Sequence, residues 1–348
     1  MRVVEGSRID WLGNPLRAPA GGAPDHDDAP FRFHRGLPGY APTPLIDAPQ
    51  LAEEWGVGRV LLKFEDDRFG LPAFKYLGVS WAAERLLGPP PHEPGLELIA
   101  ATDGNHGRAV ARAARLAGLG ATILVPAETV QARIDAIAAE GAAVQVVDGS
   151  YDDAVRLSAE LASEQRLVLS DTSWPGYEEV PRWVIEGYST IFHEVDEQAE
   201  GGVDIAFVPI GVGALAAAAA HHLAGRARLA GVEPVAAACV LESARAGRIT
   251  EVPGPHGSIM AGLNAGLPSL VAWPVVSRGF ELFSAAEDGL AEDGMRRLAR
   301  LGLEVGECSG GAAGAAAELL ADQGARDVLG ARGDSSVLVV LTEGVTSI

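Results

Sequence analysis

The feature that most constrains the fold of this chain is a regular alternation of short apolar runs with longer segments that repeat apolar residues every three or four positions. The short runs predict buried strands, and the longer periodic segments predict amphipathic helices. The expected strands are 60–64, 96–101, 121–126, 143–147, 167–169, 205–209, 227–233 and 336–342, and the expected helices are 74–87, 105–116, 129–140, 151–165, 184–197 and one that starts at 214. Apolar strands that alternate with helices form parallel sheets covered on both faces. We therefore predict an α/β fold with mostly parallel, twisted sheets flanked by helices.

Two stretches of the chain interrupt this alternation. Residues 1–40 are rich in glycine and proline and predict an irregular arm that lies over the core. Residues 277–302 predict mainly helix. The chain has 348 residues, and because domains hold roughly 100–200 residues each, we expect two domains.

The overall charge argues against several classes of partner. The chain carries a formal net charge of −20 at pH 7, which repels nucleic acid and anionic membranes. Residues 1–15 contain no long apolar segment, and the alanine-rich run 214–220 is too short to span a bilayer. Cys239 and Cys308 lie in no metal-ligand or disulfide spacing. We expect a cytoplasmic protein that binds no metal, no nucleic acid and no membrane.

The basic residues are unevenly divided between the two types. The chain has 27 lysines and arginines, and among them only Lys63 and Lys75 are lysines. Arginine provides surface charge equally well, but its guanidinium stays protonated and cannot form a Schiff base as a deprotonated lysine can. The two lysines can therefore mark positions that require an amine, or they can reflect a biased composition alone. Composition does not decide between these interpretations.

Lys75 follows the largely apolar segment RFGLPAF at 68–74 and stands at the start of an expected helix. Apolar surroundings desolvate an amine and lower its pKa, which favours a nucleophile. The alternative is an exposed lysine in the first turn of a helix, but the positive end of the helix dipole disfavours a cation there. The position therefore favours a functional amine.

A glycine turn follows the expected strand 205–209. It consists of Gly211, Val212, Gly213 and Ala214 and leads into an alanine-rich helix. Glycines let the backbone approach an anion, and free N–H groups at the start of a helix attract it. Such a turn can also serve only to pack a helix closely against a strand. We favour a phosphate site, although the spacing matches neither a P-loop nor a dinucleotide fingerprint.

A second turn, ATDGNHGR at 101–108, joins an expected strand to an expected helix. Asn105 can donate a hydrogen bond to a ligand oxygen, and Asp103 can act as a base. Either residue could instead cap the helix. A cap explains one polar residue, but it does not explain an aspartate, an asparagine and a histidine grouped with two glycines. The turn therefore favours a functional site.

The ordered motifs resemble those of the fold-type II pyridoxal phosphate (PLP) enzymes, a group that includes the threonine and serine dehydratases and the cysteine synthases. Within this group they are most similar to those of the diaminopropionate ammonia-lyases. The resemblance runs from about residue 38 to the C-terminus. It rests on PGYAPTPL at 38–45, RFGLPAFK at 68–75, ATDGNHGR at 101–108, YDDAVRL at 151–157, DTSWPGY at 171–177, GVEP at 231–234, IMAGLNAG at 259–266, SGGAAG at 309–314 and LTEG at 341–344.

The resemblance implies how the cofactor is held. Lys75 would bind PLP covalently as a Schiff base, and Asn105 would contact the hydroxyl group of the cofactor ring. Backbone N–H groups of the glycine turn would bind the phosphate. Thr342 would lie near the pyridine nitrogen. The fold implied is a large PLP-binding domain, formed by residues 1–75 and 190–348, and a small domain of residues 76–189, with the cofactor in the cleft between them.

The resemblance also implies the reaction. It predicts α,β-elimination of 2,3-diaminopropionate, a small amino acid, to pyruvate and ammonia, catalysed by a homodimer. Asp103 and Asp171 would act as catalytic acids and bases on different sides of the substrate, which would account for the use of both D- and L-isomers. Three alternatives remain open: a dehydratase acting on serine or threonine, a β-replacement synthase, and a PLP-binding protein without turnover.

Overall fold

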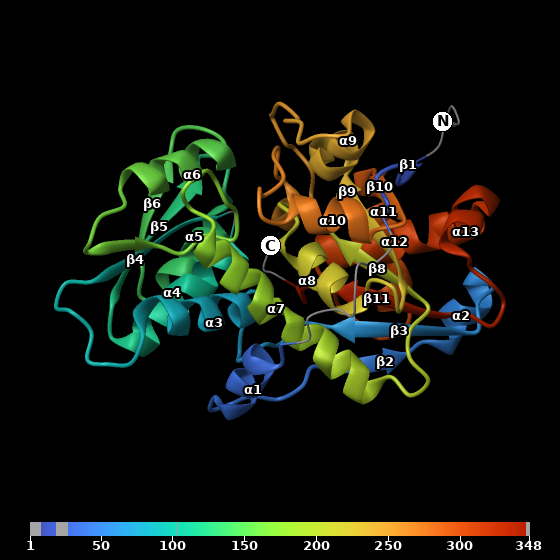
Figure 1. Cartoon of the computed structure of the whole chain (residues 1–348), viewed down its shortest axis with the longest axis horizontal. Coiled ribbons are helices and arrows are strands. Elements are labelled where there is room, and N and C mark those ends of the chain that lie inside the picture. Colours follow the sequence, from blue (N-terminus) through green and yellow to red (C-terminus); the bar gives the residue numbers. More distant parts are fainter. Residues whose placement is uncertain (1–7, 19–26, 103, 346–348) are drawn as a thin grey trace.

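The computed structural model describes residues 8–18, 27–102 and 104–345, and these residues form two β-sheets surrounded by helices (Figure 1). The larger sheet has the strand order β1-β10-β9-β8-β11-β3-β2. Its strands are β1 (Ile9–Gly13), β2 (Leu45–Asp47), β3 (Arg59–Phe64), β8 (Ile205–Pro209), β9 (Arg228–Pro234), β10 (Leu282–Ala286) and β11 (Ser336–Leu341). Neighbouring strands are parallel, except that the edge strands β1 and β2 pair antiparallel with β10 and β3.

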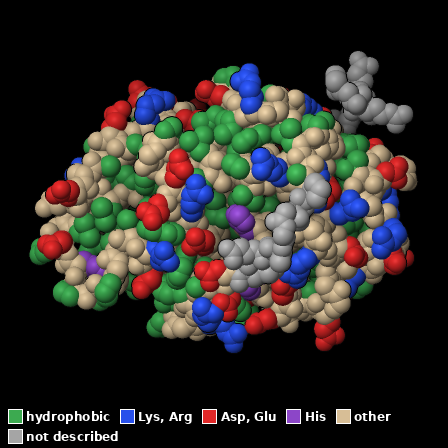
Figure 2. Space-filling model, in the orientation of Figure 1, with side chains coloured by type: hydrophobic (Ala, Val, Ile, Leu, Met, Phe, Trp, Pro, Cys, Tyr) green, Lys and Arg blue, Asp and Glu red, His purple; other side chains and the backbone are tan. Residues whose placement is uncertain are grey.

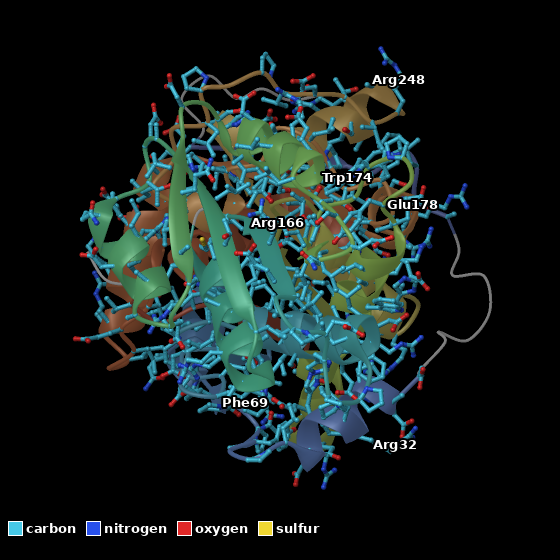
Figure 3. All side chains as sticks on the ribbon, turned by 90° about the vertical axis from the view of Figure 1, so that its left-hand side faces the viewer. Arg32, Phe69, Arg166, Trp174, Glu178 and Arg248 are labelled. Atoms are coloured by element: carbon cyan, nitrogen blue, oxygen red, sulfur yellow. The ribbon has the colours of Figure 1, made fainter. Side chains whose placement is uncertain are left out.

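The smaller sheet has the order β6-β5-β4-β7, and its neighbouring strands are all parallel. Its strands are β4 (Glu97–Ala101), β5 (Gly120–Pro126), β6 (Ala143–Val147) and β7 (Arg166–Val168). Figure 3 views the molecule from the side on which this sheet lies and labels Arg166, the first residue of β7. The α/β fold with mostly parallel sheets that the sequence predicts is confirmed.

Helices flank both sheets. They are α1 (Ala29–Gly36), α2 (Pro49–Trp55), α3 (Lys75–Leu87), α4 (Asn105–Ala117), α5 (Gln131–Ala138), α6 (Tyr151–Glu160), α7 (Glu179–Gln198), α8 (Ala214–Leu223), α9 (Cys239–Ala246), α10 (Trp273–Gly279), α11 (Asp288–Ala299), α12 (Glu307–Ala321) and α13 (Gln323–Leu329). In the described part of the chain, none of them combines the length and the apolarity that crossing a bilayer requires. The face shown in Figure 2 intersperses acidic and basic side chains with apolar ones.

Side chains of the central strands alternate between two hydrophobic cores, one on each face of the larger sheet. In β11, Leu338 and Val340 belong to the core that includes α7 and α8, whereas Val337 and Val339 belong to the core that includes α11 and α12. All four side chains are fully buried. Burial on both faces explains why these strands are continuous apolar runs in the sequence and do not alternate with polar residues.

Two stretches differ from the prediction. The sequence predicts mainly helix for 277–302, but residues 282–286 form β10, which is buried between β1 and β9. A short apolar run of this kind cannot be told from a helix by its periodicity. The described part of residues 1–40 is not wholly irregular, because it contains β1 and α1. The pairing of β1 with β10 joins opposite ends of the chain, which local sequence does not reveal.

Two predicted helices have different ends. α6 ends at Glu160 instead of 165, because the chain turns back through the bridge between Ser163 and Arg166 to enter β7. α7 begins at Glu179 instead of 184, and Pro181 lies within its first turn. A proline is tolerated there because the first N–H groups of a helix have no partner within it.

Lys63, the first of the two lysines, lies in a buried ion network. Its Nζ is 2.7 Å from Oε2 of Glu194 and donates a hydrogen bond of 2.8 Å to the carbonyl oxygen of Thr43. Arg68 contacts both Glu65 and Glu194, and all four charged side chains are at most 1% exposed. Removing one member of such a network leaves an uncompensated buried charge. This lysine therefore has a structural role, linking β3 and α7 to the segment that precedes Lys75.

Candidate active site

A pocket opens at the carboxyl ends of β4, β8 and β11, where residues of both sheets meet. The space inside it, with the open solvent at its mouth included, is about 920 Å³. Every site residue that the sequence predicts and the structure describes lines this pocket: Lys75, Asn105, Asp171, Gly211, Val212, Gly213, Ala214 and Thr342. Asp103 lies outside the described residues.

The parallel strands explain why residues so far apart in the sequence meet here. Asn105 follows β4, the glycine turn follows β8, and Thr342 directly follows β11. Strands β8 and β11 are neighbours in the larger sheet, so the segments that leave their carboxyl ends are adjacent. Open α/β sheets bind their ligands at this edge.

Lys75 is the first residue of α3, and its Nζ lies 2.7 Å from Oδ2 of Asp171. The two side chains are 19% and 6% exposed. Burial lowers the pKa of Lys75, but attraction to the Asp171 carboxylate outweighs it and raises the pKa above its usual range. Burial acts to raise the pKa of Asp171, yet Lys75 holds it below its usual range. The sequence-based prediction of a lowered lysine pKa is wrong. The carboxylate that compensates the burial of the amine comes from a residue 96 positions away in the sequence.

The glycine turn brings backbone N–H groups to the pocket. Gly213 has φ 98°, a left-handed conformation that favours glycine. A Cβ at Gly211 would lie 3.2 Å from the carbonyl oxygen of Gly262, so glycine there permits a close backbone approach. Helix α8 begins at Ala214, and the N–H groups of its first turn have no partner within the helix. An amine and an anion-binding turn in one pocket match the aldehyde and the phosphate of PLP, so these residues fit that cofactor.

Glu343 is a site residue for which the sequence predicted no role. Its Oε2 accepts a hydrogen bond of 2.8 Å from Nδ2 of Asn105, and its Oε1 accepts one of 3.2 Å from the backbone N–H of Cys308. The side chain lines the pocket, and burial raises the pKa of Glu343. These contacts fix the Asn105 amide at the pocket wall. The available signal was the position of Glu343 in the LTEG motif, immediately after a buried strand.

Thr342 is buried at the end of β11 and contributes to the same wall. Its carbonyl oxygen accepts a hydrogen bond of 3.4 Å from the N–H of Phe74, the residue before Lys75. The N–H of Gly344 donates to the carbonyl oxygen of Pro72 at 3.1 Å. The LTEG segment therefore holds the start of α3 in place and positions Lys75 relative to the pocket.

His106 and Tyr188 also approach the pair formed by Lys75 and Asp171. Nδ1 of His106 lies 3.8 Å from Oδ2 of Asp171, and the centroid of the Tyr188 ring lies 6.0 Å from Nζ of Lys75. Both side chains are buried. His106 belongs to the turn that the sequence singled out, but without a role of its own. Tyr188 lies inside a helical periodicity and carries no signal that separates it from a core residue.

Residues 37–343 match the family of pyridoxal-phosphate dependent enzymes. The chain is 35% identical to the diaminopropionate ammonia-lyase of Escherichia coli (strain K12), over 91% of this chain and 88% of that relative. It is 35% identical to the enzyme of the same name from Salmonella typhimurium (strain LT2), over 90% of this chain and 88% of that relative. A crystal structure of the Escherichia coli enzyme in complex with an aminoacrylate-PLP azomethine reaction intermediate shares the fold, with a TM-score of 0.90, 33% identity, and coverage of 97% of this chain and 94% of that chain. The chain therefore belongs to the pyridoxal-phosphate-dependent enzymes and, within them, to the family of the diaminopropionate ammonia-lyases.

Proposed function

We propose that this protein catalyses the PLP-dependent α,β-elimination of 2,3-diaminopropionate to pyruvate and ammonia. The observation that carries the proposal is the pairing of Lys75 with Asp171 at 2.7 Å in a pocket whose wall includes the glycine turn. PLP-dependent removal of a Cα proton needs an amine, a base and an anion site together. The relatives named diaminopropionate ammonia-lyase support the choice of substrate.

Several residues have a proposed role in holding the cofactor. Lys75 binds it covalently through its amine, the glycine turn binds its phosphate, and Asn105 contacts its ring hydroxyl. Thr342 would contact its pyridine nitrogen. When bound, PLP supplies an electron sink that stabilises negative charge at the Cα of an amino acid. Glu343 keeps the Asn105 amide in position through the hydrogen bond of 2.8 Å.

Proton transfer is assigned to two aspartates. Asp171 takes the Cα proton of one substrate isomer, and Asp103 takes the Cα proton of the other. Lys75 keeps the Asp171 carboxylate ionised before it accepts this proton, since their attraction lowers the pKa of Asp171. The β-amino group gains a proton and leaves as ammonia. The enamine that the protein releases then reacts with water, which yields pyruvate and another molecule of ammonia.

We further propose that the protein is a cytoplasmic homodimer with a large domain of residues 1–75 and 190–348 and a small domain of residues 76–189. The location is supported by the two cysteines, Cys239 and Cys308, both of which are described, buried and free of disulfides. The domain division is supported by the two sheets, because the strands of the smaller sheet come from within residues 97–168.

The test is product formation by the purified protein loaded with PLP. We expect each isomer of 2,3-diaminopropionate to give pyruvate together with two molecules of ammonia, whereas serine would give one. A keto-acid product from serine or threonine, without any from diaminopropionate, would favour a dehydratase. Turnover of serine only when an added nucleophile is supplied would favour a β-replacement synthase. If addition of PLP produced no visible absorption band, the assignment of the cofactor would fail.

A further inference from the structure

His106 is a buried imidazole next to the proposed base, and it has no assigned function in the proposed reaction. It is the second residue of α4 and is 5% exposed. Its Nε2 lies 2.9 Å from the carbonyl oxygen of Leu169, and its Nδ1 lies 3.8 Å from Oδ2 of Asp171. The ring therefore connects the end of the smaller sheet with the Asp171 carboxylate.

The contact with Leu169 fixes the tautomer of the ring. A carbonyl oxygen only accepts hydrogen bonds, so Nε2 of His106 carries the hydrogen. Burial lowers the pKa of His106, and the charge of Lys75 lowers it further, although Asp171 acts in the opposite direction. The position in the first turn of α4 also disfavours a cation. The ring is therefore neutral, and Nδ1 presents a lone pair.

Within the described residues, Nδ1 of His106 is buried and has no hydrogen-bond partner. An unsatisfied buried acceptor has lost its hydrogen bond to water without gaining another, so its presence calls for an explanation. Oδ2 of Asp171, the proposed base, lies 3.8 Å from this nitrogen. An ionised carboxylate cannot donate a hydrogen bond to a lone pair, but a protonated carboxyl group can.

We propose that Nδ1 of His106 accepts a hydrogen bond from Asp171 once Asp171 has taken the substrate proton, which makes His106 a positioning residue for this base. The inference rests on the proposed function, in which the proton of Cα moves to an oxygen of Asp171 and the electron pair of the C–H bond stays with the substrate. The hydrogen bond from Asp171 to Nδ1 of His106 exists only after that proton transfer begins. Interactions present only at that stage accelerate the step without strengthening substrate binding.

The other groups around Asp171 complement this arrangement. Lys75 reaches it from α3 and stabilises its ionised form. Tyr188 faces both residues from α7, and burial raises the pKa of Tyr188 and so keeps its phenol neutral. His106, from α4, offers an acceptor. Asp171 thus has a cation on one side that favours the state before proton uptake and a lone pair on another side that favours the state afterwards.

The kinetic test compares His106→Gln with the unmodified protein on each isomer separately. A glutamine amide can still donate to Leu169 but has no counterpart of Nδ1. We expect kcat to fall about 10- to 100-fold, the size of one hydrogen bond to an ionisable group, for the isomer that depends on Asp171. We expect KM for that isomer, the apparent affinity for PLP, and kcat for the other isomer to stay within about twofold. An equal loss on both isomers would contradict the inference, because it would indicate general damage to the fold.

A double variant provides a second kinetic readout. If His106 acts through Asp171, combining His106→Gln with Asp171→Asn should lower kcat no further than Asp171→Asn alone. Multiplicative losses would show that the two side chains act independently, and the inference would be wrong. A protein that forms no pyruvate from either isomer even without substitutions would instead contradict the proposed function.

A spectroscopic readout needs no turnover and leaves His106 intact. In Lys75→Ala, Asp171 loses its cationic partner while its burial still acts to raise its pKa, so the carboxyl group should share a proton with Nδ1. In the unmodified protein, we expect the ¹⁵N chemical shift of Nδ1 to be that of a bare acceptor, a nitrogen whose lone pair receives no hydrogen bond. In Lys75→Ala, we expect this chemical shift to move away from that value. An Nδ1 resonance that stays at the bare-acceptor position in both proteins would overturn the inference.

Discussion

Lys75→Ala is expected to lower the rate of pyruvate formation at least about a thousandfold, the scale of loss when a covalent catalytic group is removed. Alanine has no amine, so the cofactor loses its covalent attachment. The substitution also leaves Asp171, whose side chain is 6% exposed, without the cation 2.7 Å away that keeps it ionised. Steady-state kinetics with each isomer measures the loss of rate, and the visible absorption spectrum measures the loss of the covalent attachment.

Lys75→Arg is the matched control for this variant. Arginine keeps a positive charge near Asp171, but its guanidinium stays protonated and forms no covalent bond with an aldehyde. We expect Lys75→Arg to be as inactive as Lys75→Ala while retaining more of the native stability. If either variant kept the native rate of pyruvate formation, covalent catalysis through Lys75 would be excluded.

Asp171→Asn is expected to lower kcat about 10²- to 10⁴-fold for one isomer of 2,3-diaminopropionate, the range observed for general bases. Asparagine has nearly the shape of aspartate but accepts no proton at neutral pH. The other isomer, for which Asp103 is the proposed base, should lose far less. The ratio of kcat for the D-isomer to kcat for the L-isomer is therefore the informative quantity.

The substitution also removes the anion that pairs with Lys75. Without it, burial dominates and the pKa of Lys75 should fall from its raised value, so cofactor loading should be measured alongside the rate. Equal losses on both isomers at full cofactor loading would contradict a separate base for each isomer. They would instead favour a role for Asp171 in setting the charge of Lys75.

Much of the fold was predictable because its signals are local. Strand β8 has the bounds that the sequence predicts, Ile205–Pro209, since this apolar run between turn residues has the length of a strand and is too short for a typical helix. Helix α4 ends before Gly118, whose φ of 72° is the left-handed conformation expected of a glycine that stops a helix. The glycine turn was predictable for the same reason, because the residues that allow its backbone conformation are consecutive in the sequence.

The remaining features depend on contacts between distant parts of the chain. Strand β1 exists because β10 offers an edge more than 260 residues later in the sequence, with Ile9 paired to Ala286. The raised pKa of Lys75 depends on Asp171, and the role proposed for His106 depends on the orientation of its ring. A sequence motif identifies such residues as polar and grouped, but only the packing of α3 and α4 against the loop after β7 shows which atoms face each other.

Borohydride reduction of the PLP-loaded protein, followed by peptide mass mapping, tests the central claim most directly. Reduction makes the covalent bond between a lysine amine and PLP permanent. Because Lys63 and Lys75 are the only lysines in the chain, the label can fall on one of two lysine-containing peptides. We predict a pyridoxyl label on Lys75 and none on Lys63, whose amine is held by Glu194 and is fully buried. A label on Lys63, or no label on either lysine, would contradict the assignment of Lys75 as the residue that binds the cofactor.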